Sequence, residues 1–524
     1  MLLDSSRRET GQILPMRYFP KCLVLLLISI LSLSARATQQ LPSRLAISRL
    51  VHQNRLQEAE TQLWSVLSQH PEEGWALDLM GTIRIRQKRT QEADALFLKA
   101  ATLNPEDVEA WRGLGDTHNL LGDRTQAIDS YTHVTALAPA DLSANKALAA
   151  LYQQSGQYDE SIKAVERIPV LVRPPQLLSV LAANYFALGQ AYNVPPLIDS
   201  ILRAKFDITA VSDFVNVLLR NGYTDDAAHI IKFAAPQSPS AEYLLTLARV
   251  RAAQGHPTEA QALLERALKL KSKSFEILFD SARLAAQQNK WGATVDFLRQ
   301  ADSVRPDQPE ILQKLSLALM KLHRNTAALS IARRLNSIQP ENPDNEFVLA
   351  SALVEAGLLD EAEPVARKLA QARPNDANSI LMLAVTEFKK DDMVAAKNEL
   401  NTCISIEPYS ADAHYYLALI AQREGNLNSA QAELEQVVKI NPNHAAALET
   451  LGILYLQQGN ASGARATLEQ AAKLAPADPQ SHYQLALAYA RLGLKDESGS
   501  EMKKYKDLRQ VADEAQKGRQ STKQ

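Results

Sequence analysis

Apolar, small and turn-forming residues return at a fixed spacing along most of the chain. Prolines mark it most clearly, because within each of two series they lie 34 residues apart: Pro71, Pro105 and Pro139, then Pro306, Pro340, Pro374, Pro408, Pro442 and Pro476. Alanine stands 12 residues before most of these prolines, and a large apolar residue such as Phe97 or Tyr131 stands eight residues before many of them. Such a period indicates an internally repeated fold.

The residue types within one interval predict a pair of antiparallel helices. Apolar positions spaced by three and four residues give each helix one buried stripe. Small residues let two helices approach closely, a central glycine such as Gly122 or Gly459 ends the first helix, and the proline ends the second. A single hairpin cannot bury its own stripe, so neighbouring units must stack.

Two units carry the pattern most completely. They hold Trp111, Leu114, Gly115, Gly122, Ala127, Tyr131 and Pro139 in the unit from Val108, and Leu448, Leu451, Gly452, Tyr455, Gly459, Ala464, Leu468, Ala471 and Pro476 in the unit from Ala445. This pattern resembles the tetratricopeptide repeat. The resemblance implies an all-α fold, a right-handed superhelical solenoid of about 14 antiparallel helix-turn-helix repeats of 34 residues. Units begin near residues 40, 74, 108, 142, 176, 208, 241, 275, 309, 343, 377, 411, 445 and 479.

The first forty residues have the pattern of a secretory signal peptide. Arg17 and Lys21 precede an apolar run from Cys22 to Ala35, and the small residues of Ala35-Arg36-Ala37 predict cleavage after Ala37. As a helix the run spans about 21 Å, which is short for a bilayer core of about 30 Å. We therefore expect an exported protein, periplasmic or associated with the cell envelope. An uncleaved anchor is the alternative, and either Met1 or Met16 could be the start.

Departures from the period divide the rest of the chain. The unit at 176 has Pro195-Pro196 in place of its alanine position and follows a Pro-rich stretch, which indicates either a hinge or ordinary drift of the repeat. The predicted segments are residues 1–37 as signal peptide, 38–168 as N-terminal arm, 169–207 as degenerate repeat and candidate hinge, 208–494 as C-terminal arm, and 495–524 as capping helix and frayed tail.

Composition and charge exclude several classes of protein. The 57 Lys and Arg residues nearly balance the 59 Asp and Glu residues, so we expect no nucleic-acid partner. Two cysteines cannot build a disulfide scaffold or a four-cysteine zinc site. We expect membrane contact only through the N-terminal segment, if that segment is retained.

No catalytic motif accompanies the repeats. The chain lacks H-E-x-x-H, both glycine-rich phosphate-binding patterns and G-x-S-x-G, so we expect no enzyme, no cofactor and no metal site. His414 and His482 occupy equivalent places two units apart, which favours helix packing over metal binding. Cys403 replaces an Ala, Val or Leu of other units, which favours an inert core thiol.

The resemblance places function on the concave face, at fixed positions of each first helix. In the later units these positions hold apolar residues, and the predicted partner-binding groove is Phe347, Leu381, Val385, Phe388, Tyr415, Leu419, Ile453, Tyr483 and Leu487. In the early units they hold Arg112, Asp116 and Lys146, a secondary polar groove. The competing interpretations are packing between first helices for the apolar set and a solvated surface for the polar set.

Two classes of function fit these residues. An apolar groove favours a non-enzymatic scaffold or adaptor that binds a partner polypeptide, and exported arrays that resemble this one suggest envelope assembly, secretion or polysaccharide export. The alternative is a carrier of a glycan or an acyl ligand in the same groove.

Overall fold

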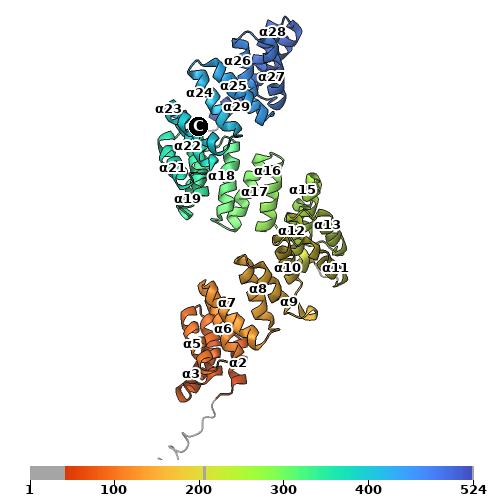
Figure 1. The fold of residues 1–524 in the computed structure, drawn as a ribbon. Helices are drawn as coiled ribbons and strands as arrows, with labels where there is room; N and C mark the ends of the chain where they lie inside the picture. Colours follow the sequence, from red (N-terminus) through yellow and green to blue (C-terminus); the bar gives the residue numbers. More distant parts are fainter. Residues whose placement is uncertain (1–41, 205–207, 522–524) are drawn as a thin grey trace, which may run out of the picture. The chain divides into compact units, whose positions relative to one another are not determined.

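The computed structural model describes residues 42–204 and 208–521. The expected signal peptide, with its cleavage after Ala37, lies outside the described residues. Within these ranges the chain forms 28 α-helices, two short 3-10 helices and no β-strand (Figure 1). The 28 helices form 14 successive pairs, which confirms the all-α repeat solenoid.

The chain separates into two compact units, which are described one at a time. The first, residues 1–238, contains the following described helices: α2 (Arg44–His52), α3 (Leu56–Gln69), α4 (Gly74–Arg86), α5 (Thr90–Leu103), α6 (Val108–Leu121), α7 (Arg124–Leu137), α8 (Leu142–Gln154), α9 (Tyr158–Glu166), η1 (Val170–Val172), α10 (Gln176–Ala187), η2 (Ala191–Asn193), α11 (Pro195–Ala204), α12 (Ile208–Arg220) and α13 (Thr224–Phe233).

The second unit, residues 239–524, continues the same alternation of first and second helices. Its described helices are α14 (Ala241–Ala253), α15 (Pro257–Leu270), α16 (Phe275–Gln287), α17 (Trp291–Val304), α18 (Pro309–Lys321), α19 (Asn325–Ile338), α20 (Pro343–Glu355), α21 (Leu359–Ala372), α22 (Ala377–Lys389), α23 (Met393–Ile406), α24 (Ala411–Arg423), α25 (Leu427–Ile440), α26 (Ala445–Gln457), α27 (Ala461–Leu474), α28 (Pro479–Arg491) and α29 (Lys495–Ser521).

Within each compact unit, most second helices pack against their own first helix and against the first helix of the next pair; α11 is the exception, because its main contacts are with η2 and α13. Helix α5 contacts both α4 and α6, and α27 contacts both α26 and α28. First helices also touch one another along the array, as α4 touches α6 and α26 touches α28. The first helices therefore share one side of each unit, here called the inner side.

Glycines at fixed places allow the close helix contacts. A Cβ atom added at Gly81 would lie 2.8 Å from the ring of Phe97, and one added at the equivalent Gly452 would lie 2.4 Å from Cγ of Leu468. Both partners are buried, with Phe97 3% and Leu468 0% exposed. The same solution therefore operates in both compact units.

The turn inside each pair needs a left-handed backbone conformation. Gly459 adopts it with φ of 80°, as the sequence predicts for a glycine that ends a first helix. Lys88 and His323 stand at the same place in other pairs and adopt φ of 60° and 52°. Tertiary packing thus imposes this turn even where the residue opposes it.

The degenerate repeat keeps both of its helices. Pro195 and Pro196 lie in the first turn of α11, where a proline does not remove an internal hydrogen bond. The boundary between the compact units lies between Ser238 and Pro239, in the connection from α13 to α14, which contains two prolines. A hinge within 169–207 stays a prediction.

Candidate functional site

The predicted apolar groove lies on the first helices of the second compact unit. Its members are half-buried with one exception, and those half-buried side chains, here called the late strip, are Phe347 on α20, Leu381 and Val385 on α22, Tyr415 and Leu419 on α24, Ile453 on α26, and Tyr483 and Leu487 on α28. Half-burial means that each side chain both packs against the array and exposes part of its apolar surface.

Neighbouring side chains support the late strip. Leu381 and Leu419 pack against the core shared by α22 and α24. The ring of Tyr415 lies 5.0 Å from the ring of His444, and that of Tyr483 lies 5.1 Å from Tyr505 on α29. These contacts restrict the rotamers of the strip, which lowers the entropic cost of binding a ligand.

Phe388 is the exception, because the structure places it in the core. Its side chain is 8% exposed, the guanidinium of Arg423 lies 4.5 Å from its ring centroid, and Tyr416 meets its edge at 5.2 Å. The last turn of α22 directs Phe388 toward the next first helix, α24, and both covering side chains belong to α24. Phe388 therefore belongs to the core against which Leu381 and Leu419 of the late strip pack.

The early polar residues do not form one cluster. Arg112 is half-buried on α6, where it donates hydrogen bonds to Glu109 at 2.5 Å and to Asp141 at 2.7 Å. Asp116 is exposed on α6, where its carboxylate accepts a hydrogen bond from the hydroxyl of Tyr131 at 2.6 Å. Lys146 is exposed on α8. The structure therefore gives two of the three a packing role.

A recurring contact joins the fifth residue of a first helix to the residue that caps the next first helix, 29 positions later. Arg112 meets Asp141 in this way, and Tyr415 meets His444. Asp78 meets Asp107 at the same place between α4 and α6, and burial followed by Asp107 raises the pKa of Asp78 to about 7. Sequence analysis missed Asp78, although an acidic residue 29 positions before a capping aspartate would have indicated it.

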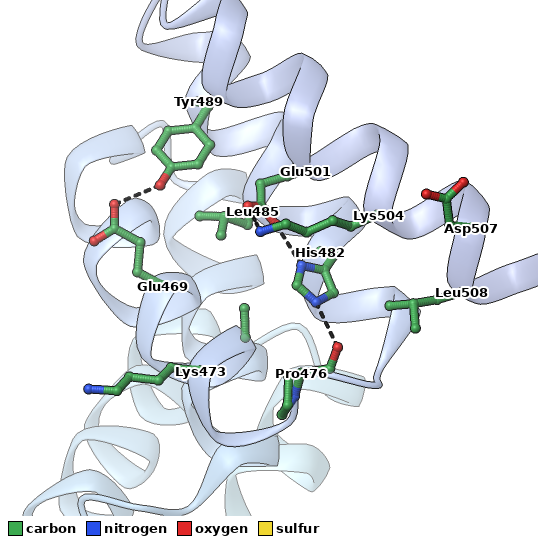
Figure 2. A pocket seen from close by; sticks show the side chains of 11 residues that line it. Glu469, Lys473, Pro476, His482, Leu485, Tyr489, Glu501, Lys504, Asp507 and Leu508 are labelled. Atoms are coloured by element: carbon green, nitrogen blue, oxygen red, sulfur yellow. Dashed lines mark hydrogen bonds and ion pairs between the residues drawn. The ribbon is translucent and has the colours of Figure 1, made fainter.

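A second candidate surface lies at the end of the second compact unit. A pocket of about 590 Å³ is enclosed by α27, α28 and α29, and Figure 2 shows Glu469, Lys473, His482, Tyr489 and Lys504 around it. Residues of a helix are rotated by about 100° each, so the pocket-lining residues of α28 lie roughly opposite its late-strip residues. The pocket and the late strip are thus separate surfaces.

His482 is held on both sides in this pocket. One ring nitrogen, Nδ1, lies 2.5 Å from Oε2 of Glu501, and the other, Nε2, lies 3.1 Å from the carbonyl oxygen of Pro476 (Figure 2). His414 repeats this arrangement with Glu433 and the carbonyl of Pro408, at 2.6 and 3.2 Å. Both histidines join helices, which leaves neither ring nitrogen free for chemistry.

Other reactive groups are buried or scattered. Cys403 is 0% exposed, and burial raises the pKa of its thiol. Among the described residues, no three or more His, Cys, Asp or Glu side chains are grouped to hold a metal ion. The part of the chain that the structure describes also contains no helix that is both long and apolar enough to span a membrane.

Known proteins share the repeat pattern. Two family models, each described as tetratricopeptide repeat, match residues 387–451 and 421–489 in one case and residues 79–141, 245–309 and 314–377 in the other. Superkiller protein 3 of Schizosaccharomyces pombe is 26% identical over 121 residues, which are 23% of this chain and 9% of that protein, so the match spans under a tenth of the relative.

Two solved structures match the chain with TM-scores below 0.5. The APC/C hetero-tetramer Cut9-Hcn1 matches with a TM-score of 0.47 and 13% identity, over 92% of this chain and 96% of that one. A tetratricopeptide repeat protein from Parabacteroides merdae matches with a TM-score of 0.44 and 17% identity, over 47% of this chain and 98% of that one.

Proposed function

The chain belongs to the tetratricopeptide repeat family, whose members generally mediate protein–protein interactions, and we propose that it is a non-enzymatic scaffold which binds a partner polypeptide along the late strip. The observation that carries this proposal is a row of half-buried apolar side chains at the fifth and ninth positions of five successive first helices, α20 to α28, interrupted by Ser351 and Glu449. We further propose that the protein acts in the cell envelope after export, in assembly, secretion or polysaccharide export. The signal-peptide pattern ending at Ala37 supports this setting.

The chemistry of the late strip favours an apolar partner segment. Tyrosine is enriched among the few residues that supply most of the binding energy at protein interfaces, and the surrounding apolar side chains exclude water from them. Fully burying one such exposed side chain is worth roughly 1.5 to 3 kcal/mol. Tyr415 and Tyr483 add a hydroxyl group at the edge of each ring, which suits a polypeptide backbone as well as side chains.

Charged side chains at two helix ends beside the late strip are paired within the array, whereas Glu449 on α26 stands within the strip and burial raises the pKa of its carboxyl group. Asp344 in the first turn of α20 pairs with Arg373 at 2.8 Å, and Arg423 in the last turn of α24 pairs with Asp391 at 3.0 Å. Such charges also suit the helix dipole, which explains their places at the helix ends. The surface therefore selects a partner by apolar contact more than by net charge.

The test compares capture of partners from envelope extract by three forms of the full mature chain. One is the parent chain, the second carries Tyr415→Glu with Leu419→Glu, and the control carries Ala432→Glu with Gln436→Glu on α25. Ala432 and Gln436 are exposed on the second helix of the same pair, so the control adds the same charge away from the strip. Equal circular dichroism establishes that all three fold.

The expected result is one polypeptide retained by the parent and the control and lost from the late-strip variant. Retention by all three forms would contradict the proposal. A lipid or glycan that co-purifies with the parent and leaves only with the late-strip variant, detected by mass spectrometry, would favour the alternative of a glycan or acyl carrier. A mature chain from the periplasm that begins at Thr38 would support export, and an intact chain in the cytoplasm would contradict it.

A further inference from the structure

Asp78 is a buried carboxyl group without a hydrogen-bond donor. It lies on the inner side of α4 with 6% of its surface exposed, and neither of its side-chain oxygens has a hydrogen-bond partner. An unpaired charge in such a place costs several kcal/mol, so buried carboxyl groups either pair with a cation or hold a proton. The surroundings of Asp78 decide between these two states.

The nearest titratable neighbour is a second carboxyl group. Asp107 caps α6, and its Oδ1 accepts hydrogen bonds from the backbone N–H groups of Glu109 at 3.0 Å and Ala110 at 3.3 Å. Asp107 stands 29 positions after Asp78, as Asp141 stands after Arg112, and α4 contacts α6, so the two carboxyl groups face each other across this junction. Because two ionised carboxylates are both acceptors only, a proton on one of them is required to join them.

The other charged groups around Asp78 do not replace that proton. Glu109 on α6 adds negative charge, and Arg44 on α2 acts in the opposite direction without donating a hydrogen bond to Asp78. The second helices α3 and α5 carry Glu60 and Glu92, and both pair with Arg84 on another face of α4.

The next pair of helices shows what the same place holds when a donor is present. Between α6 and α8, the guanidinium of Arg112 lies at the position of Asp78 and donates to Asp141, the residue equivalent to Asp107, at 2.7 Å. A cation therefore satisfies the capping carboxylate in one junction. In the α4–α6 junction the side chain is another acid, which can donate a hydrogen bond to Asp107 only when one of the two carboxyl groups is protonated.

We propose that Asp78 and Asp107 form a proton-binding site, in which one shared proton holds α4 against α6 and loss of that proton loosens this junction. Burial, and next the charge of Asp107, raise the pKa of Asp78 to about 7 from its usual value of 3.8. The folded chain therefore binds the proton more tightly than the unfolded chain. Its stabilising effect is complete below about pH 4, falls between about pH 4 and 7, and is absent above pH 7.

Hydrogen exchange of α4 and α6 in the full chain, corrected for the intrinsic rate, tests this site between pH 4.5 and 8.5. We expect the opening equilibrium of these helices to rise up to tenfold per pH unit toward pH 7 and then to level off. Asp78→Asn, which keeps the shape and cannot ionise, should remove this added slope. Asp129→Asn on α7, an exposed carboxylate outside the junction, is the matched control and should keep it.

A direct titration of Asp78 tests the same proposal without a substitution, and so remains informative if Asp78→Asn perturbs the fold. The side-chain carboxyl 13C signal of Asp78, measured in the intact chain, should titrate with a midpoint near pH 7. Asp107→Asn keeps a good capping residue and should move that midpoint to lower pH. A midpoint near pH 4 in the parent chain, or a slope that persists in Asp78→Asn, would overturn the proposal.

Discussion

The inner sides of the two compact units are built on the same helix pairs but present different chemistry. Around α6 the fifth and ninth residues are Arg112 and Asp116, whereas around α24 they are Tyr415 and Leu419. The helix contacts beneath them are equivalent, since Phe97 against Gly81 and Leu468 against Gly452 solve the same packing problem. The difference shows that stability and recognition depend on separate positions of one repeat.

The junctions between neighbouring first helices show this separation of stability and surface chemistry at a single helix position. One position holds Arg112 against Asp141, Asp78 against Asp107, and Tyr415 against His444. The backbone accepts an ion pair, a carboxyl pair or two tilted rings there. Such tolerance lets the inner side vary while the fold is kept.

Removal of a scaffold side chain should have the largest effect, and the same effect in both units. Phe97→Ala and Leu468→Ala each empty a buried site, and we expect losses of about 3 to 5 and about 2 to 5 kcal/mol. Urea unfolding with hydrogen exchange of the affected helices measures each loss. A decrease in the free energy of unfolding of less than about 1 kcal/mol in only one unit would show that the two scaffolds are not equivalent.

Removal of the inner-side cation Arg112 should lower the free energy of unfolding by less than removal of a scaffold side chain, and by more than the equivalent substitution in the second unit. Arg112→Met keeps the aliphatic stem but leaves Asp141 without its guanidinium, and we expect a loss of about 1 to 3 kcal/mol. Tyr415→Leu, at the equivalent place on α24, should cost about 0.5 to 1.5 kcal/mol because it removes only ring contacts. Equal losses, measured by urea unfolding, would contradict this ranking.

Placing the arginine of the α6–α8 junction into the α4–α6 junction tests whether the two junctions are equivalent. Asp78→Arg should place a guanidinium against Asp107, as Arg112 lies against Asp141, and should raise the stability of the first unit by about 1 to 2 kcal/mol. Hydrogen exchange of α4 and α6 at pH 7.5 measures the gain. A destabilised chain would show that the two junctions are not equivalent.

The turns inside the pairs should give the smallest effects. Lys88→Gly in the first unit and His323→Gly in the second relieve a left-handed conformation, and each should gain up to about 1 kcal/mol. Gly459→Ala should lose about the same amount. Thermal unfolding of the three variants measures these changes, and a loss in Lys88→Gly would show that its side chain stabilises the turn.

The sequence predicts the scaffold well because the scaffold depends on local spacing. The 34-residue period places helix pairs, glycine turns and terminal prolines from residue types alone. It does not reveal that Phe388 is covered by Arg423, because that contact depends on how far one first helix is rotated against the next. The carboxyl pair of Asp78 and Asp107 is visible in the sequence only as two aspartates 29 positions apart, and that spacing becomes a contact only once the structure shows which residues of neighbouring first helices meet.

Site-specific photo-crosslinking tests most directly whether the late strip is the binding surface. A benzophenone amino acid is placed at Ile453 on the inner side of α26, or at the exposed Lys473, which lines the terminal pocket from α27. The account predicts a crosslink to one polypeptide from Ile453 that disappears when Tyr415→Glu and Leu419→Glu are added. A crosslink from Lys473 with none from Ile453 would contradict the account and assign binding to the terminal pocket.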